Sequence, residues 1–358
     1  MTLTLDMPAV DEAKLAAFLV KVVGDFGAVY SSALVMMGDK LRLYKALAVA
    51  GPLTPAELAE RSGTVERYVR TWLINQAAGG YVEYDPHTGR YTLPDEHALV
   101  LADESGPYAM AGGFEAVLSA LKAAPKIMEA FCTGGGLLWG EHDHGMFVGT
   151  ERFFRSGYLA NLVSRWIPAL DGVQEKLEAG ATVADVGCGH GAATIILAQA
   201  FPRSRFYGYD NHAPSIEAAR RAAAEAGVEN RVTFEVASAA EYPNLQYDLI
   251  AYFDALHDMG DPIGAIRHAR ETLAPDGTVL LVEPQAGEKV EDNLNPVGRI
   301  FSAASVLVCT PNAMASGGMG LGTIATEAQI REVVTAGGLS RFRRATETPF
   351  NRVFEARP

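Results

Sequence analysis

The sequence predicts an α/β protein with a mainly parallel sheet in its C-terminal half, preceded by a mostly helical domain. Three observations predict this fold class. From Ala181 onward, short β-rich runs alternate with helical runs, which is typical of a parallel sheet covered on both faces. The first of these strands leads into a glycine-rich loop, and the chain ends in two strand-like runs that suit an antiparallel hairpin. The residues before Ala181 show mainly helical periodicity.

Length and charge restrict the possible functions. The chain has 358 residues, which is most simply two domains with a core each. It holds 43 acidic and 30 basic residues, and this net charge of −13 argues against nucleic acid or an anionic membrane as a partner. No window of about 18 uninterrupted apolar residues and no basic secretory segment occurs, so we expect a cytoplasmic protein. Three cysteines without a close pair suit a reducing compartment.

The N-terminal region has the pattern of a winged helix. Residues 11–50 are predicted to be helical, with a break at Gly38-Asp39. Thr54-Pro55-Ala56-Glu57 is a capping box with proline at the first helical position, so a new helix begins there. Two helices and a hairpin then follow one another at 56–61, 65–78, 81–84 and 90–93.

Winged helices also occur in DNA-binding proteins, and the charge of this one tests that alternative. Residues 51–100 carry four arginines against seven carboxylates, whereas a reading helix needs surplus cations. We therefore expect this domain to support a homodimer.

Strand and helix signals divide the rest of the chain. Residues 97–180 are predicted to be mainly helical. The predicted strands are 182–186, 205–209, 231–236, 248–253 and 278–283, with a final hairpin of 341–347 and 351–356. Helices are expected at 191–200, 214–226 and 262–273. The predicted domains are a winged-helix-like dimerisation domain at 1–105, a helical linker and pocket segment at 106–180, and a ligand-binding domain at 181–358.

The sharpest signal is the loop Gly187-Cys188-Gly189-His190-Gly191, which directly follows a predicted strand. Glycines let the backbone turn tightly and approach a ligand, and the next helix supplies free amides. Asp185 stands two residues before the loop, and Asp210 closes the next strand 19 residues after Gly191. A carboxylate in the position of Asp210 can hold both hydroxyls of a ribose.

Two nucleotide-like ligands compete for this loop. Gly187-x-Gly189-x-x-Ala192 also fits the dinucleotide pattern, with Asp210 as its ribose acid. Asp185 would repel a diphosphate but suits an ammonium and a sulfonium group. We therefore favour S-adenosylmethionine over a nicotinamide or flavin cofactor, and over a purely structural turn.

Residues 181–358 resemble the class I S-adenosylmethionine-dependent methyltransferases. This resemblance implies a Rossmann-like seven-stranded sheet with an antiparallel last strand. Together with its winged-helix-like front, the whole chain resembles two-domain small-molecule methyltransferases, whose N-terminal domain builds a homodimer. It is most similar to an actinobacterial group of poorly defined substrate, which shares strings like those at 253–262 and 292–299.

The resemblance implies a set of cofactor contacts. Asp185 and the three loop glycines would surround the methionine end, Asp210 would hold the ribose, and Asn211 would lie beside the adenosine. The family often places Gly-Asp-Ala after the third strand, whereas this chain has Ala237-Ser238-Ala239. Phe253 would face the methionine portion or serve as a core aromatic. The implied cofactor residues are Asp185, Gly187, Gly189, Gly191, Asp210, Asn211, Ser238, Ala239 and Phe253.

His257 is the predicted catalytic base. Methyl transfer from a sulfonium needs a base only when the acceptor must lose a proton, and imidazole can take a proton near neutral pH. The segment His257-Asp258-Met259-Gly260-Asp261 is similar to the His-Asp-Trp-x-Asp segment of plant phenolic O-methyltransferases, whose histidine is the base. Glu283 matches the acid that orients it. A second such acid is expected just before Thr326, where Ile324-Ala325 stands. His257 could instead contact substrate or cofactor, or cap a loop.

We expect O-methylation of a phenolic or similar hydroxyl on a small, partly apolar molecule, as in secondary metabolism. The alternatives are transfer to nitrogen or carbon of an electron-rich ring, and a non-catalytic scaffold or regulator that binds S-adenosylmethionine. Glu141-His142-Asp143-His144 has two histidines at metal-ligand spacing but no third ligand nearby. We expect this segment to be a solvated loop or pocket rim, and we predict no metal site.

Overall fold

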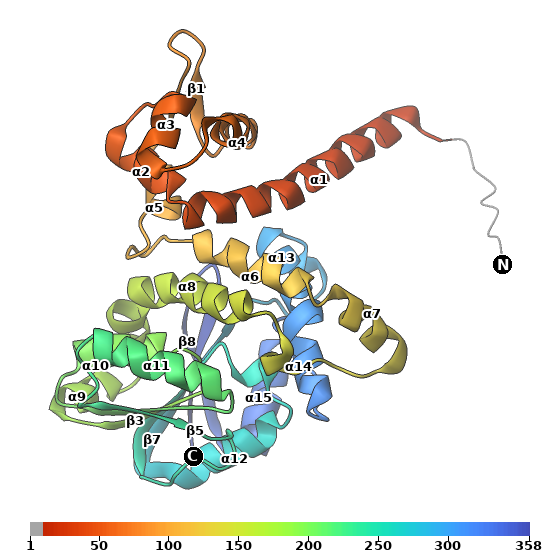
Figure 1. The fold of residues 1–358 in the computed structure, drawn as a ribbon. Helices are drawn as coiled ribbons and strands as arrows, with labels where there is room; N and C mark the ends of the chain where they lie inside the picture. Colours follow the sequence, from red (N-terminus) through yellow and green to blue (C-terminus); the bar gives the residue numbers. More distant parts are fainter. Residues whose placement is uncertain (1–9) are drawn as a thin grey trace. The chain divides into compact units, whose positions relative to one another are not determined.

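The computed structural model describes residues 10–358. The chain divides into two compact units, Met1–Glu104 and Ser105–Pro358 (Figure 1). The predicted segment 106–180 thus belongs to the same compact unit as the sheet that follows it.

The first unit contains the predicted winged helix. Thr54 caps a helix through a complete capping box with Glu57, as predicted. The elements in chain order are α1 (Glu12–Lys40), α2 (Leu43–Ala50), α3 (Pro55–Ser62), α4 (Glu66–Ala78), β1 (Glu83–Asp85), β2 (Arg90–Thr92) and α5 (Asp95–Leu101). The two strands form an antiparallel hairpin.

The predicted helix break is present but lies at Leu41-Arg42, three residues after Gly38-Asp39. Helix α1 continues to Lys40, and the chain turns at Arg42, which has a positive φ of 58°. Gly38 serves close packing, because a Cβ there would lie 2.5 Å from Cζ2 of Trp72. A glycine in a helical pattern therefore marks a close helix contact here rather than a helix end.

Much of α1 is exposed although it is apolar. Its exposed large apolar side chains are Leu15, Phe18, Leu19, Val20, Val23, Phe26, Val29, Tyr30 and Met37. By length and composition, α1 could cross a membrane, and only 6% of its apolar window is buried. Core helices and N-terminal signal sequences pass the same test, so this composition is weak evidence for a membrane.

The second unit is built on the expected seven-stranded sheet, with the strand order β5-β4-β3-β6-β7-β9-β8. Its strands are β3 (Thr182–Val186), β4 (Arg205–Asp210), β5 (Val232–Val236), β6 (Tyr247–Phe253), β7 (Leu273–Pro284), β8 (Arg341–Glu347) and β9 (Asn351–Arg357). The first five pair in parallel, and β9 is antiparallel to both of its neighbours, as the resemblance implied.

Helices cover both faces of this sheet (Figure 1). The α-helices are α6 (Ala111–Leu121), α7 (Ala124–Thr133), α8 (His144–Asn161), α9 (Val173–Ala179), α10 (Ala192–Ala200), α11 (Ala213–Glu225), α12 (Pro262–Thr272), α13 (Pro296–Ala304), α14 (Thr310–Ala315) and α15 (Glu327–Ala336). Short 3₁₀ helices are η1 (Trp139–Glu141), η3 (Ile167–Ala169), η4 (Leu256–Asp258) and η5 (Glu291–Asn293); η2 (Leu162–Trp166) and η6 (Ser305–Cys309) are π-helical.

Alternate residues of each strand enter two separate cores. Val183 on β3 packs in one cluster with residues of α10 and α11, whereas the next residue, Ala184, packs in another with residues of α12 and α15. This alternation follows from the two-residue period of a strand. Because the first five strands of this sheet are parallel, their carboxyl ends lie at one edge of the sheet, where the loops after them meet.

Candidate functional site

The glycine loop lies between β3 and α10. Gly187, Gly189 and Gly191 all have positive φ, at 79°, 52° and 78°, a region that other residues rarely adopt. A Cβ at Gly191 would lie 2.4 Å from the ring of Phe234, so this glycine is needed for packing. A Cβ at Gly189 would meet no atom within 4 Å, so the backbone there faces open space. Gly189 is therefore placed for close approach of a ligand.

Asp185, at the end of β3, is a buried carboxylate with one free oxygen. Its side chain is 2% exposed, and Oδ2 accepts a 2.5 Å hydrogen bond from the hydroxyl of Thr194. Oδ1 is buried without a hydrogen-bond partner. Burial raises the pKa of Asp185 to about 7. An orphaned carboxylate oxygen of this kind is a cost that a cationic ligand would offset.

Asp210 ends β4 on the other side of the loop. Its two oxygens accept hydrogen bonds from the backbone N–H groups of Gly189, at 2.9 Å, and His212, at 2.8 Å. Burial raises the pKa of this carboxyl as well. Each carboxylate oxygen has a second lone pair, so Asp210 can still accept from the hydroxyls of a ribose.

The remaining predicted cofactor residues follow the neighbouring strands. Asn211 is exposed directly after β4. Ser238 and Ala239 are half-buried after β5, where the Ser238 hydroxyl donates to Glu241 Oε2 at 3.2 Å. Phe253, at the end of β6, is buried in the core, with its ring centroid 5.5 Å from that of Tyr158. Since these strands are parallel neighbours, all these positions lie at one edge of the sheet.

These side chains fit S-adenosylmethionine better than a dinucleotide. The free oxygen of buried Asp185 suits an ammonium, and Asp210 suits ribose hydroxyls. No lysine or arginine occurs between residues 181 and 202 to balance a diphosphate. Burial lowers the pKa of His190, the one basic side chain in the loop, which favours its neutral form.

His257 and Glu283 are brought together, although 26 residues separate them. His257 lies in η4 after β6, and Glu283 lies near the end of the adjacent strand β7. Nδ1 of His257 is 2.7 Å from Oε2 of Glu283, and the two side chains are 3% and 1% exposed. A buried carboxylate at Nδ1 fixes the orientation of the ring and stabilises its charged form.

Asp258 occupies the other side of the imidazole, which the sequence reasoning missed. Its Oδ1 lies 3.1 Å from Nε2 of His257, an ion-pair distance without hydrogen-bond alignment. Burial works against the charged ring, but the charges of Asp258 and Glu283 prevail and raise the pKa of His257 well above its ordinary value. Without a ligand the two carboxylates therefore favour the charged form of the imidazole. The only sequence signal was the adjacency of an acid to His257.

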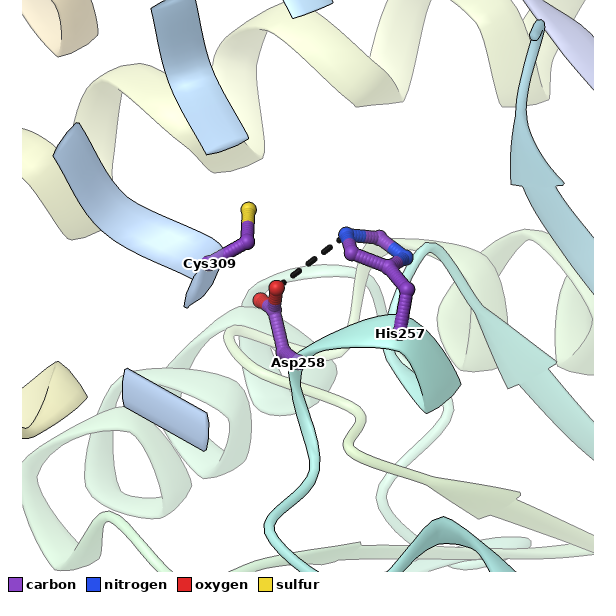
Figure 2. Close-up of side chains that lie close together, drawn as sticks. All are labelled: His257, Asp258 and Cys309. Carbon is purple, nitrogen blue, oxygen red and sulfur yellow. Dashed lines mark ion pairs between the residues drawn. The ribbon is translucent and has the colours of Figure 1, made fainter. Parts of the chain in front are cut away.

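Cys309 completes this cluster from η6. Figure 2 shows its thiol and the side chains of His257 and Asp258 converging from two separate segments. Cys309 is buried, and burial together with the charge of Asp258 raises the pKa of its thiol to about 12. No local pattern in the sequence could place this thiol beside a histidine 52 residues away.

Asp254 is a further missed residue in the turn before His257. It has a positive φ of 52°, unusual for a residue with a side chain. Its carboxyl accepts hydrogen bonds from Nδ2 of Asn351, at 2.8 Å, and from the hydroxyl of Tyr158, at 3.2 Å. Burial and the nearby charge of Glu283 raise the pKa of Asp254 to about 8. These contacts tie the turn to β9 and α8.

The glycine loop and the His257 turn are in direct contact. A Cβ at Gly187 would lie 2.7 Å from Cβ of Ala255 and 3.7 Å from Cε of Met259. The position expected for the methionine end of a cofactor is thus next to the candidate base. By contrast, the second acid expected before Thr326 is replaced by Ala325. Ala325 is buried in the core, and its carbonyl accepts a hydrogen bond from Arg352.

The segment Glu141–His144, expected to be a solvated loop or a pocket rim, is only partly buried: Glu141 and His144 are exposed, whereas His142 is not. His142 is 7% exposed, and neither ring nitrogen has a hydrogen-bond partner. Gly140, just before it, approaches the ring of His212, which lies 4.6 Å from that of Phe147. His142 is therefore packed inside the unit, whereas Glu141 and His144 on either side of it remain exposed.

Comparisons with known proteins agree with this geometry. Residues 177–329 match the family model described as a methyltransferase domain, and residues 30–103 match the model of an Rv2258c-like winged HTH domain. The chain is 32% identical over 170 residues to the 27-O-demethylrifamycin SV methyltransferase of Amycolatopsis mediterranei. That alignment covers 45% of this chain and 60% of the relative, so the chain spans less than two thirds of it.

Solved structures resemble the whole fold. Human N-acetylserotonin methyltransferase in complex with SAM has a TM-score of 0.72 at 16% identity, covering 98% of this chain and 99% of its own. The mitomycin 7-O-methyltransferase MmcR has a TM-score of 0.71 at 18% identity, covering 97% and 100%. At such identities the likeness establishes the fold.

Proposed function

Because this chain joins a class I S-adenosylmethionine-dependent methyltransferase domain to an Rv2258c-like winged helix–turn–helix domain, we propose that it methylates a hydroxyl group of a small, partly apolar molecule. A phenolic or similar hydroxyl is the proposed acceptor. The observation that carries this proposal is the contact between two segments of the chain, the glycine loop and the turn that bears His257. A glycine loop flanked by the buried carboxylate of Asp185 and the half-buried carboxylate of Asp210 adjoins a buried histidine–glutamate pair at the same edge of the sheet.

S-adenosylmethionine is the methyl donor of this domain type and supplies a methyl group on a sulfonium. Asp185 would hold the ammonium of the methionine portion, and Asp210 would hold the ribose. The three loop glycines let the backbone approach the ligand, while Asn211, Ser238 and Ala239 line the adenosine side. Positioning and exclusion of water then contribute most of the barrier reduction, because the leaving group is already good.

His257 acts as the general base through Nε2. In the ligand-free protein this nitrogen faces Asp258, so an acceptor hydroxyl must displace that carboxylate. Displacing Asp258 removes one of the charges that raise the pKa of His257, and the ring can then exist in the neutral form that a base requires. Glu283 remains at Nδ1, where it orients the ring and stabilises the imidazolium formed by proton transfer.

The position of Asp258 favours one second candidate function. If Asp258 stays in place, His257 remains charged and can only orient a substrate. Transfer to a nitrogen or to a carbon of an electron-rich ring needs no base before the methyl group moves, so such acceptors are the alternative.

A turnover screen separates these functions. Purified protein is incubated with methyl-labelled S-adenosylmethionine and sets of phenols, amines and indoles. O-methylation of a phenol supports the proposal, and turnover of only amines or indoles supports the second candidate. Tight binding of S-adenosylhomocysteine without turnover on any set would instead indicate a non-catalytic scaffold.

We also propose that the N-terminal unit forms a homodimer through α1. This helix exposes Phe18, Val23, Phe26 and Tyr30, and a partner helix would cover this apolar surface. Light scattering after size exclusion should give twice the chain mass, and Phe26→Glu should shift the protein towards monomer. A monomeric wild-type protein at micromolar concentration would contradict the dimer.

A further inference from the structure

The cluster of His257, Asp258 and Cys309 has the composition of a zinc site. One nitrogen, one carboxylate oxygen and the sulfur lie within 4.8 Å of one another (Figure 2). Ligand atoms around tetrahedral zinc lie about 3–4 Å apart, so small side-chain rotations would close the site. Imidazole, carboxylate and thiolate are the three ligand types that zinc uses in proteins.

The hydrogen bonding around the cluster prepares His257 as a ligand. Glu283 Oε2 accepts from Nδ1 at 2.7 Å, and this bond directs the Nε2 lone pair towards Asp258 and Cys309 once the ring is neutral. The carboxylate–histidine–metal arrangement is typical of metal sites, because the outer carboxylate fixes the tautomer and makes the ring a better donor.

Unpartnered buried atoms are the second observation that indicates a ligand. Oδ1 of Asp258 and Oε1 of Glu283 are both buried without a hydrogen-bond partner. Two carboxylates and a thiol surround one imidazole, so a divalent cation would take over the positive charge that the ring gives up when it loses its Nε2 proton.

His142 provides a further buried imidazole. Both of its ring nitrogens are unpartnered, and its side chain is more than nine-tenths buried.

The segment that carries His142 is hydrogen-bonded, through Asn312, to the turn that carries Asp258. Trp139 N–H donates to Oδ1 of Asn312 at 2.8 Å, and Nδ2 of Asn312 donates to the Asp258 carbonyl at 2.9 Å. Asn312 lies in α14, directly after the π-helix that ends in Cys309. One asparagine thus connects the turns that carry His142 and Asp258.

We propose that His257 Nε2, the Asp258 carboxylate and Cys309 Sγ bind one Zn²⁺ ion. His142 lies outside this 4.8 Å group and becomes a fourth ligand only if its ring moves closer. Binding forms Zn–N, Zn–O and Zn–S bonds and releases the thiol proton and the Nε2 proton to solvent. The bound ion occupies the lone pair that the proposed base uses, so zinc inhibits methyl transfer. This inhibition rests on the proposed function, whereas the binding does not.

Metal titration of the full chain tests the site without an activity assay. The protein is stripped with a chelator and titrated with Co²⁺ and with Zn²⁺. We expect one equivalent per chain, a thiolate-to-cobalt charge-transfer band, and displacement of cobalt by zinc. Cys309→Ala should lose the band, whereas Cys132→Ala, which removes an exposed thiol, should keep it. Glu283→Gln should weaken zinc binding about 10–100-fold.

Three results would overturn the site: no stoichiometric metal binding, an unchanged band in Cys309→Ala, or loss of the band in Cys132→Ala. Asp258→Asn is the second variant should Cys309→Ala not fold, as judged by circular dichroism, and it should weaken zinc binding in the same way. Inhibition is measured against each variant's own metal-free rate. If zinc binds but does not slow methyl transfer, the metal site stands and only the proposed inhibition through His257 is overturned.

Discussion

The glycine loop and the His257 turn are neighbours, but they differ in whether their charged side chains already have a partner of opposite charge. In the loop, Asp185 keeps a buried oxygen with no partner, and its pKa is raised to about 7. In the turn, the imidazole of His257 has a carboxylate on each side. The loop therefore has a buried carboxylate oxygen that a cationic ligand could pair with. In the turn, by contrast, an acceptor must displace the existing ion pair between Asp258 and His257.

Replacing the base should give the largest difference between the two regions. His257→Ala removes the proton acceptor but none of the loop contacts. O-methylation should fall about 10²–10⁴-fold, the usual contribution of a general base. The affinity for S-adenosylhomocysteine should change less than about 2-fold, since the proposed cofactor contacts remain. Single-turnover rates and calorimetry measure the two effects.

His87→Ala is the matched control, because His87 is exposed on the hairpin of the first unit. It should alter neither quantity. If His257→Ala kept the full rate of O-methylation, His257 would not be the general base and would have only a structural role.

Removing the charge of the loop should have the reverse effect. Asp185→Asn keeps the shape and the acceptor for Thr194 but loses the charge. A charge-assisted contact contributes about 1.5–3 kcal/mol, so S-adenosylhomocysteine should bind about 10–100-fold more weakly at pH 8. Wild-type affinity should fall as the pH drops through about 7, because Asp185 must release a proton to bind an ammonium. The variant should lack this pH dependence, and a persistent dependence would exclude Asp185 as its origin.

The same substitution should stabilise the ligand-free protein. The folded pKa of Asp185 lies above its ordinary value, so the folded state holds this proton more tightly than the unfolded chain. The contribution of Asp185 to stability is therefore greatest below about pH 4 and declines as the pH rises towards 7. Asp185→Asn should melt at a higher temperature than the wild type at pH 8, and the difference should shrink at pH 5. Equal melting curves at pH 8 would mean that the buried carboxylate costs nothing.

Two alanine substitutions inside the loop should separate binding from folding. Each adopts a left-handed conformation at a cost of about 1–2 kcal/mol. Gly191→Ala should lose a further 1–3 kcal/mol or so, because its Cβ meets Phe234. Gly189→Ala meets no protein atom and should mainly weaken S-adenosylhomocysteine binding. Chemical denaturation and calorimetry compare them, and a Gly189→Ala variant with unchanged ligand affinity would move the ligand away from this loop.

The two regions also differ in how far the sequence predicts them. The loop depends on local geometry, so strand 182–186, the glycines and Asp210 are all apparent from consecutive residues. The pairing of His257 with Glu283 is predicted only through the family resemblance, and the structure places the two side chains 2.7 Å apart. Asp254, held by Asn351 and Tyr158, and Cys309, beside Asp258, depend on contacts between distant segments that carry no periodic signal.

Misjudged elements have a common physical origin. Gly38 resembles a helix break, but tertiary packing against Trp72 requires a small residue inside a continuous helix. Glu141 and His144 are exposed, as the composition of this segment suggests, but His142 between them is buried. In both places, contacts between elements override what the local residues favour.

Calorimetry with two ligands tests the central claim most directly. S-adenosylhomocysteine and NADH are each titrated into the purified full chain at pH 8. We expect saturable heat with one site per chain for S-adenosylhomocysteine and none for NADH. Saturable heat from NADH, with none from S-adenosylhomocysteine, would show that the loop between Asp185 and Asp210 binds a diphosphate and would contradict the account.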